Sequence, residues 1–458
     1  MDTTYSLAQN VVVTNYQNIP MEVVEVTKKE ILDSLGIGLA GSGTAGIKEI
    51  VGIVREWGGK PESTILVYGG KVPAPNAAQV NASMVHALDF DDTHDLAVVH
   101  PASVAVPSAL AMAERQGRVS GKELITAIAL GVDLACRMAL ATKLRRKIIR
   151  ASGGWHPTVM YGFFSAAAVA GKLLRLDEEK MLNALGIAYH QAAGNVQCVA
   201  DGAMTKKMGP GFAAKGGITA ALMAEKGITG ARDCIEGEVS IYNLYHDGCN
   251  LDELTLQLGK SFEGANVSFK PYPCCRINHR YIDAALEVVK QYDIKPEEVD
   301  EIEVTAGTKT WNALCQPLDV KRQPRNIVDS QFSLPWTMAC VVVRRKVGLK
   351  EFTEESIKDP ALLKMSHKVT PVHDSSFEEK MDSPMNIKIK TKRGEFTQKT
   401  GAPYGSPANP MTMEAMTDKF RDCASVAIKS LPQINHVIDM VTKLEELDNV
   451  SDIFQWLG

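Results

Sequence analysis

The stretch from residue 86 to residue 101 reads HALDFDDTHDLAVVHP and concentrates aspartates, a threonine and three histidines between apolar residues. Crowded carboxylates in a partly buried site raise one another's pKa, so that an acid or a base can work near neutral pH. We therefore predict a proton-transfer site that uses Asp89, Thr93 and His100. A solvated acidic turn and a metal site are the alternatives, since Asp and His are also metal ligands.

Two further segments combine glycines with a functional side chain. At 153–158 the sequence GGWHPT places His156 between glycines and a rigid proline, at the start of an alanine-rich run. At 205–211 the sequence TKKMGPG predicts a glycine-rich loop before a helix, where Lys206 and free N–H groups bind an anion. The alternatives are a structural histidine and a solvated basic loop.

The fourth segment, FKPYPCCRINH, lies at a predicted domain boundary. Lys270 and Arg276 are suited to bind carboxylates, the arginine in bidentate fashion, and His279 follows them as a further substrate-binding candidate. A thiol beside a cation ionises more readily, so Cys275 is a candidate acid or base. A small buried hydrophobic role is the alternative for this cysteine.

Helices must position these segments, because apolar residues recur at helical spacing through the first half of the chain. Gly36, Gly38 and Gly41 match the GxGxxG pattern formally. A dinucleotide fingerprint needs a preceding strand, whereas the residues before these glycines are helical, so we expect the glycines to end that helix. The predicted helices cover 20–39, 102–116, 122–140, 162–176, 178–193 and 212–226.

The pattern changes near residue 265. EIEVTAG at 301–307 alternates as a strand does, MNIKIKTKRGEFTQKT at 385–400 predicts a hairpin, and 331–343 predicts a helix kinked at Pro335. Helical spacing returns over 412–430 and 434–447. The fold class is therefore mostly α with an α+β insertion. We predict a helical domain over 1–265, a smaller α+β lid domain over 266–402 and a return to the helical domain over 403–458.

Composition excludes several classes of protein. The net charge of −4 gives no electrostatic case for nucleic acid or an anionic membrane as a partner. Nine cysteines without a CxxC pair fit a reducing compartment and lack zinc-ribbon spacing. We find no signal peptide and no apolar run long enough to span a membrane, and we expect a cytoplasmic protein.

The four segments, in this order, resemble the MmgE/PrpD family over nearly the whole chain, together with LDSLGIGLAG near the start and PANPMTMEAMTDKF near the end. This family includes 2-methylcitrate dehydratases, cis-aconitate decarboxylases and an iminodisuccinate epimerase. The resemblance implies a helical domain with a lid domain, a homodimer, no metal or organic cofactor, a small di- or tricarboxylate substrate and an active site between the domains. The decarboxylase site residues fall on Asp89, Thr93, His100, His156, Lys206 and Lys270.

One departure from the decarboxylase pattern concerns Cys275, because the decarboxylases carry a histidine there and the epimerase carries a cysteine. The leading hypothesis is a hydro-lyase that dehydrates 2-methylcitrate or a similar hydroxy acid by acid/base elimination. The alternative is an isomerase in which Cys275 is the second base, and a cis-aconitate decarboxylase comes third. A catalytically silent dimeric binding protein and a metal-dependent hydrolase also stay open.

Overall fold

The computed structural model describes residues 2–143, 154–377 and 384–457. The chain divides into two compact units: unit 1 comprises Met1–Val267 with Thr412–Gly458, and unit 2 is Ser268–Met411. The sequence-based prediction placed the ends of the inserted domain at 266 and 402. Strand β4 (Val267–Ser268) marks the first crossing between the units.

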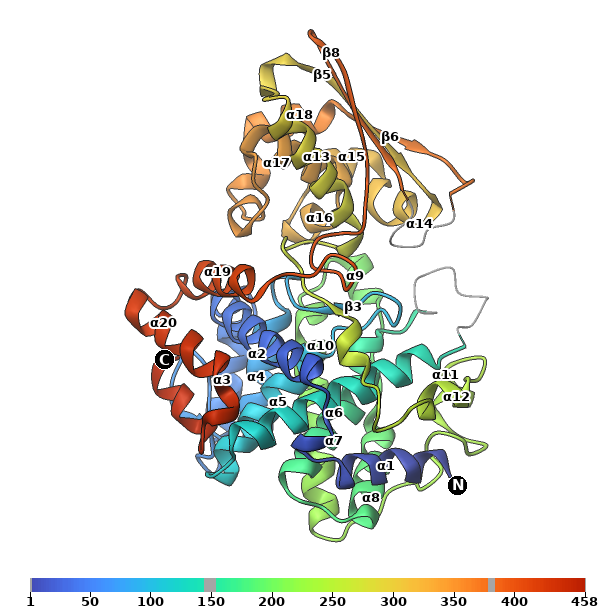
Figure 1. The fold of residues 1–458 in the computed structure, drawn as a ribbon, viewed down its shortest axis with the longest axis vertical. Coiled ribbons are helices and arrows are strands. Elements are labelled where there is room, and N and C mark those ends of the chain that lie inside the picture. Colours follow the sequence, from blue (N-terminus) through green and yellow to red (C-terminus); the bar gives the residue numbers. More distant parts are fainter. Residues whose placement is uncertain (1, 144–153, 378–383, 458) are drawn as a thin grey trace. The chain divides into compact units, whose positions relative to one another are not determined.

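Unit 1 is built almost entirely from helices, which Figure 1 shows layered around α5, α6, α7 and α10. Small residues let these helices approach closely. A Cβ on Gly217 would lie 2.4 Å from the carbonyl oxygen of Phe163, and one on Gly131 would lie 2.4 Å from Val169. The elements of unit 1 are α1 (Thr3–Val13), α2 (Met21–Gly41), α3 (Ile47–Trp57), β1 (Ser63–Thr64), β2 (Lys71–Val72), α4 (Ala74–His86), β3 (Thr93–His94), α5 (Ala102–Gln116), α6 (Gly121–Leu140), α7 (Pro157–Leu173), α8 (Glu178–Gln191), α9 (Gln197–Asp201), α10 (Thr205–Glu225), α11 (Ile241–Tyr245), α12 (Leu251–Thr255), α19 (Met413–Ala424) and α20 (Leu431–Thr442).

Of the three glycines predicted to end helix α2, Gly41 is its last residue, whereas Gly36 and Gly38 lie inside it. α2 continues to Gly41, and the C-terminal helix α19 packs against it, red beside blue in Figure 1. A Cβ on Gly36 would lie 2.9 Å from the Phe420 ring, and one on Gly41 would lie 2.2 Å from the Met84 carbonyl oxygen. The glycines are therefore points of close helix approach, which outweighs their low helix propensity.

The segment 205–211, predicted as a loop, is also helical, because α10 begins at Thr205. Its glycines again face another helix: a Cβ on Gly211 would lie 2.3 Å from the Gln79 carbonyl oxygen and 2.3 Å from Ser83 Oγ, both on α4. Close packing onto α4 explains why a sequence rich in Gly and Pro is helical here. Lys206 consequently lies in the first turn of a helix.

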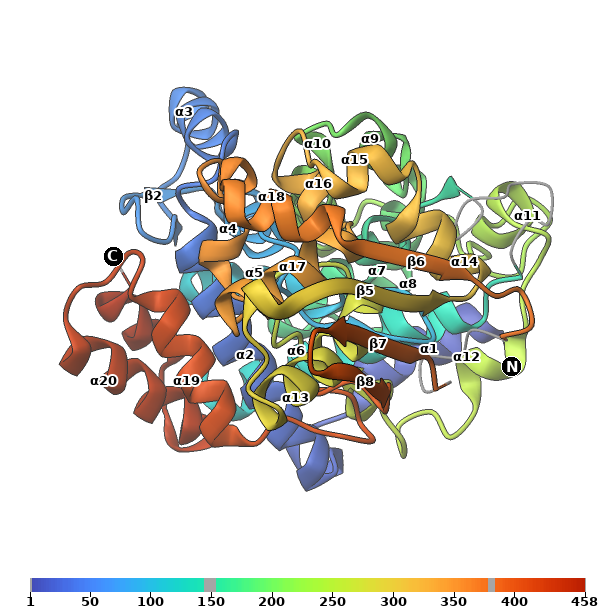
Figure 2. The same ribbon diagram turned by 90° about the horizontal axis from the view of Figure 1, so that it is seen from above.

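Unit 2 contains a four-stranded sheet in the order β6-β5-β7-β8, visible edge to edge in Figure 2. The predicted strand and hairpin are both present, and β5 pairs in parallel with β6 and antiparallel with β7. Ile302, Val304, Ile387 and Ile389 are buried at alternating positions. α13 and α17 contact the sheet. The strands are β5 (Val299–Ala306), β6 (Val369–His373), β7 (Asn386–Thr391) and β8 (Gly394–Lys399).

The helix predicted over 331–343 is two helices rather than one kinked helix. α16 ends at Gln331, and α17 begins at Leu334 with Pro335 in its first turn. Proline is tolerated there, because the first turn has no intrahelical acceptor for its missing N–H. None of the helices in the described part of either unit is long and apolar enough to cross a membrane. The helices of unit 2 are α13 (His279–Gln291), α14 (Thr308–Thr310), α15 (Leu318–Arg322), α16 (Ile327–Gln331), α17 (Leu334–Arg344) and α18 (Pro360–His367).

Candidate functional site

The predicted site residues of unit 1 come from the ends of four helices that pack on one another, α4, α5, α7 and α10. Each helix end is set by a local signal, such as a proline in the first turn of α7 and a carboxylate that caps α5. Gly153 of the GGWHPT segment lies outside the described residues. The predicted residues lie as follows: Asp89 in the turn after α4, His100 before α5, His156 before α7 and Lys206 in the first turn of α10.

The turn after α4 brings Asp89 to Lys206. Asp89 has a φ of 52°, in the left-handed region that short polar residues tolerate, and Thr93 lies in β3. Asp89 and Thr93 are four residues apart, but they do not share a helical turn. Lys206 Nζ donates to Asp89 Oδ1 at 2.7 Å, and their side chains are only 10% and 6% exposed. Removing either partner of such a buried pair would strand the other charge.

Hydrogen bonds hold both the backbone and the ring of His100. Its backbone N–H donates to Thr158 Oγ1 at 3.0 Å, and its Nδ1 lies 2.5 Å from the backbone carbonyl oxygen of Asp92. Asp92 Oδ2 in turn accepts from the N–H of Ala102, at the start of α5. A carbonyl oxygen only accepts, so Nδ1 carries the proton and the other ring nitrogen, Nε2, has the lone pair in the neutral ring.

The structure adds a histidine that our sequence analysis did not select. His86 is completely buried, and its ring centroid lies 5.3 Å from that of His100 and 5.8 Å from that of His156. His86 Nδ1 lies 2.7 Å from Asp91 Oδ2. In the sequence, His86 could have been selected because it lies five residues before Asp91, at the end of the segment that forms α4. We call His86, His100 and His156 the histidine cluster.

Burial controls the charge of this cluster. It lowers the pKa of His86 below the ordinary histidine value, against the opposing effect of Asp91. It lowers the pKa of His156 further. Positive charge adds to that decrease, from His86 when it is protonated, from Lys206 and from His100 when it is protonated. The rings of His86 and His156 are therefore neutral at neutral pH. A neutral imidazole in a site with little water can accept a proton, which suits a general base.

A second group of buried charges lies on α2 and α19. Lys419 Nζ lies 2.6 Å from Asp33 Oδ1 and 3.8 Å from the centroid of the Phe90 ring, and it donates to the Phe90 carbonyl oxygen at 3.0 Å. Burial raises the pKa of the Glu30 carboxyl well above its ordinary value, and the charges of Asp92 and Asp33 add to this increase. Glu30 therefore keeps its proton to higher pH than an exposed glutamate does, and the charge of Asp92, which caps α5, acts on it.

In unit 2, the segment from Lys270 to His279 forms a network of its own. Lys270 is buried. Arg276 Nη1 donates to the Tyr404 carbonyl oxygen at 3.0 Å and to His279 Nδ1 at 3.2 Å, and His279 Nε2 donates to the Cys274 carbonyl oxygen at 3.1 Å. Both ring nitrogens of His279 thus have partners inside unit 2. This arrangement makes His279 a support for the Arg276 guanidinium.

Cys275 lies at the start of the helical run that continues into α13, and it is only partly buried. Its N–H donates to the Gln331 carbonyl oxygen at 3.0 Å. The next carbonyl, of Phe332, accepts from Lys321 Nζ at 2.6 Å, and Ala313 O accepts from the same ammonium at 3.0 Å. Burial lowers the pKa of Lys321, and the Cys275 thiol opposes this effect. The sequence analysis missed this buried lysine.

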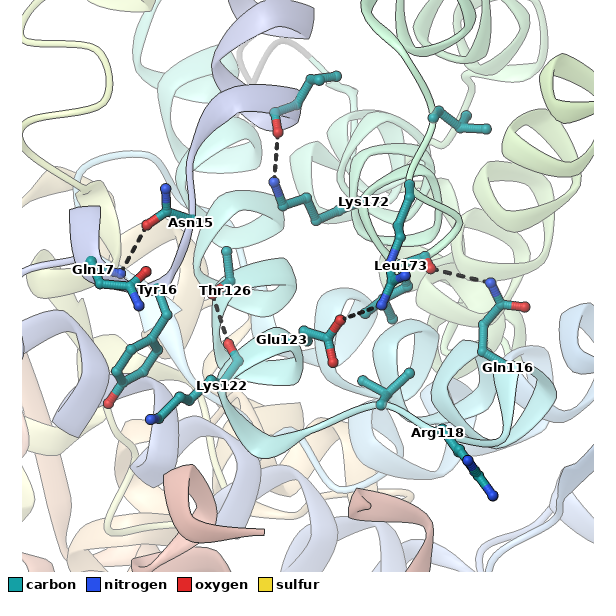
Figure 3. Close-up of a pocket in the computed structure, with 14 residues that line it drawn as sticks. Asn15, Tyr16, Gln17, Gln116, Arg118, Lys122, Glu123, Thr126, Lys172 and Leu173 are labelled. Atoms are coloured by element: carbon teal, nitrogen blue, oxygen red, sulfur yellow. Dashed lines mark hydrogen bonds and ion pairs between the residues drawn. The ribbon is translucent and has the colours of Figure 1, made fainter. Parts of the chain in front are cut away.

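A separate groove of about 730 Å³ lies in unit 1 between η1 (Tyr16–Asn18) and the ends of α5, α6 and α7 (Figure 3). Lys172 Nζ donates there to the carbonyl oxygens of Val12 and Thr14, and Arg175 pairs with Glu123 at 2.9 Å. The groove contains none of the predicted catalytic residues. We therefore place the candidate active site at the histidine cluster rather than in this groove.

Comparison with protein families agrees with the division of the chain. The MmgE/PrpD N-terminal domain model matches residues 5–254, and the MmgE/PrpD C-terminal domain model matches residues 272–444. The chain belongs to the MmgE/PrpD family. The C-terminal model extends beyond unit 2 into α19 and α20, so the family's sequence domains and the compact units do not end at the same residues.

Curated MmgE/PrpD relatives cover nearly the whole chain. The chain is 25% identical to the cis-aconitate decarboxylase of Aspergillus terreus over 464 aligned residues, which span 96% of this chain and 93% of the relative. It is 27% identical to the cis-aconitate decarboxylase of Mus musculus, with 94% of this chain and 88% of the relative covered. The human cis-aconitate decarboxylase is also 27% identical, with 94% and 89% covered.

The metal alternative rested on the Asp and His residues of the stretch 86–101. Among the described residues, no group of three or more His, Cys, Asp and Glu side chains has an arrangement that could hold a metal ion. The carboxylates next to the histidine cluster have other partners: Asp89 binds Lys206, Asp91 binds His86, and Asp92 caps α5.

Proposed function

We propose that this MmgE/PrpD chain is a cofactor-independent lyase that removes water from a small polycarboxylate of the 2-methylcitrate or citrate type. The observation that carries the proposal is the histidine cluster, which lies buried beside the Lys206–Asp89 ion pair. Elimination next to a carboxylate needs a base for a weakly acidic C–H, a cation for the developing charge and an acid for the leaving hydroxyl. Unit 1 supplies residue types for all three.

In this mechanism His156 or His100 takes the proton from carbon, because each ring can be neutral with a lone pair. The electron pair left on carbon forms the double bond and expels the hydroxyl group. This group takes up the proton that the histidine removed from carbon, so that water leaves and the histidine returns to its neutral form. Lys206 stabilises the enediolate-like charge on the neighbouring carboxylate, and Asp89 with Thr93 orients the leaving hydroxyl. Lys270 and Arg276 are proposed to bind the other carboxylates, and His279 supports Arg276.

The test is proton NMR of citrate, 2-methylcitrate and related di- and tricarboxylates, incubated in deuterium oxide with enzyme treated with a chelator. We expect the signals of an unsaturated acid, which are a vinyl proton from citrate and a methyl group on the double bond from 2-methylcitrate, with no carbon dioxide release. His156→Ala should abolish these signals while the protein stays folded. An enzyme that produces no unsaturated acid from any of these hydroxy acids would contradict the dehydratase proposal.

A second candidate is decarboxylation of cis-aconitate, and the similarity to cis-aconitate decarboxylases favours it. Decarboxylation needs a proton donor for the carbanion that remains after carbon dioxide leaves, whereas burial keeps His86 and His156 neutral. Release of carbon dioxide from cis-aconitate in the same assay would establish this reaction in place of dehydration.

The third candidate is an isomerase, favoured by Cys275 and the nearby Lys321. A two-base epimerisation removes a proton on one face and returns one on the other, so solvent deuterium would enter a recovered diacid without loss of water. For all three reactions we propose a cytoplasmic homodimer as the working form, which light scattering at micromolar concentration would test.

A further inference from the structure

His86 and His100 share one carboxylate. Asp91 Oδ2 lies 2.7 Å from His86 Nδ1 and 4.0 Å from His100 Nδ1. His86 and Asp91 are both almost fully buried, at 0% and 1% exposed side chain. His86, at the end of α4, therefore holds the same Asp91 oxygen, Oδ2, that lies near His100, which precedes α5.

The hydrogen bonds define what each ring can do. An ionised carboxylate only accepts, so the neutral ring of His86 donates its Nδ1–H to Asp91. No described residue offers a hydrogen-bond partner to His86 Nε2, which is buried. Leaving a buried ring nitrogen without a partner costs about 1–3 kcal/mol. A histidine kept at such a cost, next to the proposed proton carriers, is a candidate for a functional role.

We propose that His86 is a positioning residue: it holds the Asp91 carboxylate beside His100, so that Asp91 stabilises the imidazolium formed when His100 accepts the substrate proton. This inference rests on the proposed function, and within it on His100 rather than His156 as the residue that takes the proton. The proton goes from substrate carbon to His100 Nε2, and the electron pair of the broken C–H bond stays on the substrate. Asp91 remains ionised throughout, and His86 remains neutral.

A positioning role for His86 depends on its Nδ1 atom, which binds Asp91, whereas a packing role depends only on the shape of the side chain. Asparagine places its amide nitrogen close to the position of Nδ1, whereas glutamine places it close to that of Nε2. His86→Asn should therefore keep the bond to Asp91, and His86→Gln or His86→Phe should lose it. We expect kcat to fall on the order of 100-fold in His86→Phe, with KM changed by less than about two-fold, because a misplaced charge acts on the reacting state.

The decisive comparison is between the two amide variants, which have similar polarity. His86→Asn should retain at least about ten-fold more kcat than His86→Gln. The control is His246→Phe, which removes another buried histidine of unit 1, one whose Nε2 contacts the Tyr161 hydroxyl at 3.1 Å. This control should lower stability without lowering kcat. Equal kcat values for the two amide variants, or an unchanged kcat in His86→Phe, would overturn the inference.

A structural measurement separates this inference from the proposed reaction. Crystal structures of the parent and of His86→Gln should show the Asp91 carboxylate displaced from His100 only in the variant, with the Oδ2–Nδ1 distance well above 4.0 Å. This result does not depend on which substrate is turned over. A carboxylate that keeps its place in the variant would refute the positioning role, whereas a parent without activity on any polycarboxylate would refute only the proposed function.

Discussion

The histidine cluster of unit 1 and the cysteine segment of unit 2 handle charge differently. In unit 1 a buried cation meets a carboxylate side chain, as in the Lys206–Asp89 pair. In unit 2 the buried ammonium of Lys321 donates to two backbone carbonyl oxygens, which carry no net charge. A carboxylate therefore balances the buried cation beside the histidine cluster, whereas neutral backbone dipoles balance the one beside Cys275.

The largest effect should come from removing the proposed base of unit 1. His156→Ala should lower kcat by about 10²- to 10⁴-fold, the usual contribution of a general base. The rate is measured by NMR on the substrate identified in the screen. His190→Ala, on the exposed end of α8, is the matched control and should have no effect. A His156→Ala enzyme with parental kcat would show that His156 is not the base and would leave His100 as the proposed proton acceptor of unit 1.

The ion pair offers a test of the charge balance inside unit 1. Lys206→Met should destabilise the fold by about 3–5 kcal/mol, because Asp89 is left buried and charged. The double variant with Asp89→Asn should recover most of that stability in urea denaturation, since asparagine also tolerates the left-handed backbone at this position. Activity should not recover. Additive losses in the double variant would show that the two side chains do not depend on each other.

Cys275 tests whether unit 2 takes part in proton transfer. If the enzyme is a dehydratase, Cys275→Ala should change kcat by less than about ten-fold, because unit 1 supplies the acid and the base. If it is an isomerase, the same variant should lose deuterium incorporation by at least about 100-fold. Cys198→Ala, on the partly buried α9 of unit 1, is the control. A strong loss of dehydration in Cys275→Ala would show that Cys275 of unit 2 takes part in the dehydration.

The smallest effect concerns Glu30 and depends on pH. Burial raises its pKa in the folded protein, so the folded state keeps this proton at pH values where the unfolded chain has lost it. The parent should therefore lose stability as pH rises from about 4.3, the unfolded glutamate value, toward the higher folded pKa. Glu30→Gln lacks this slope and should be more stable than the parent by about 1–3 kcal/mol at pH 8.

Thermal unfolding at pH 5 and pH 8 measures this effect. The exposed Glu49→Gln is the control and should leave the pH dependence of stability unchanged. A Glu30→Gln variant with the parental dependence would show that Glu30 is ionised in the folded protein.

Periodicity predicted most of the helices and the hairpin of unit 2, because each depends on a local pattern of apolar residues. It failed where glycines serve tertiary packing: Gly36 faces Phe420, and Gly211 faces Gln79. For the site, the sequence pointed to Asp89, His100, His156 and Lys206, and the structure brings them to neighbouring helix ends. It did not point to partners distant in sequence, because nothing local couples Glu30 to Asp92.

The contact of Gly211 with α4 also has a consequence for the evolution of the site. Gly211 lies five positions after Lys206 on α10. The neighbouring helix, α4, ends at His86. Adding a single methyl group at Gly211 would push α10 away from α4 and carry the lysine with it. A mutation at a position without any reactive group can therefore inactivate the enzyme. The distance between α10 and α4 at Gly211 leaves no room for one additional carbon atom.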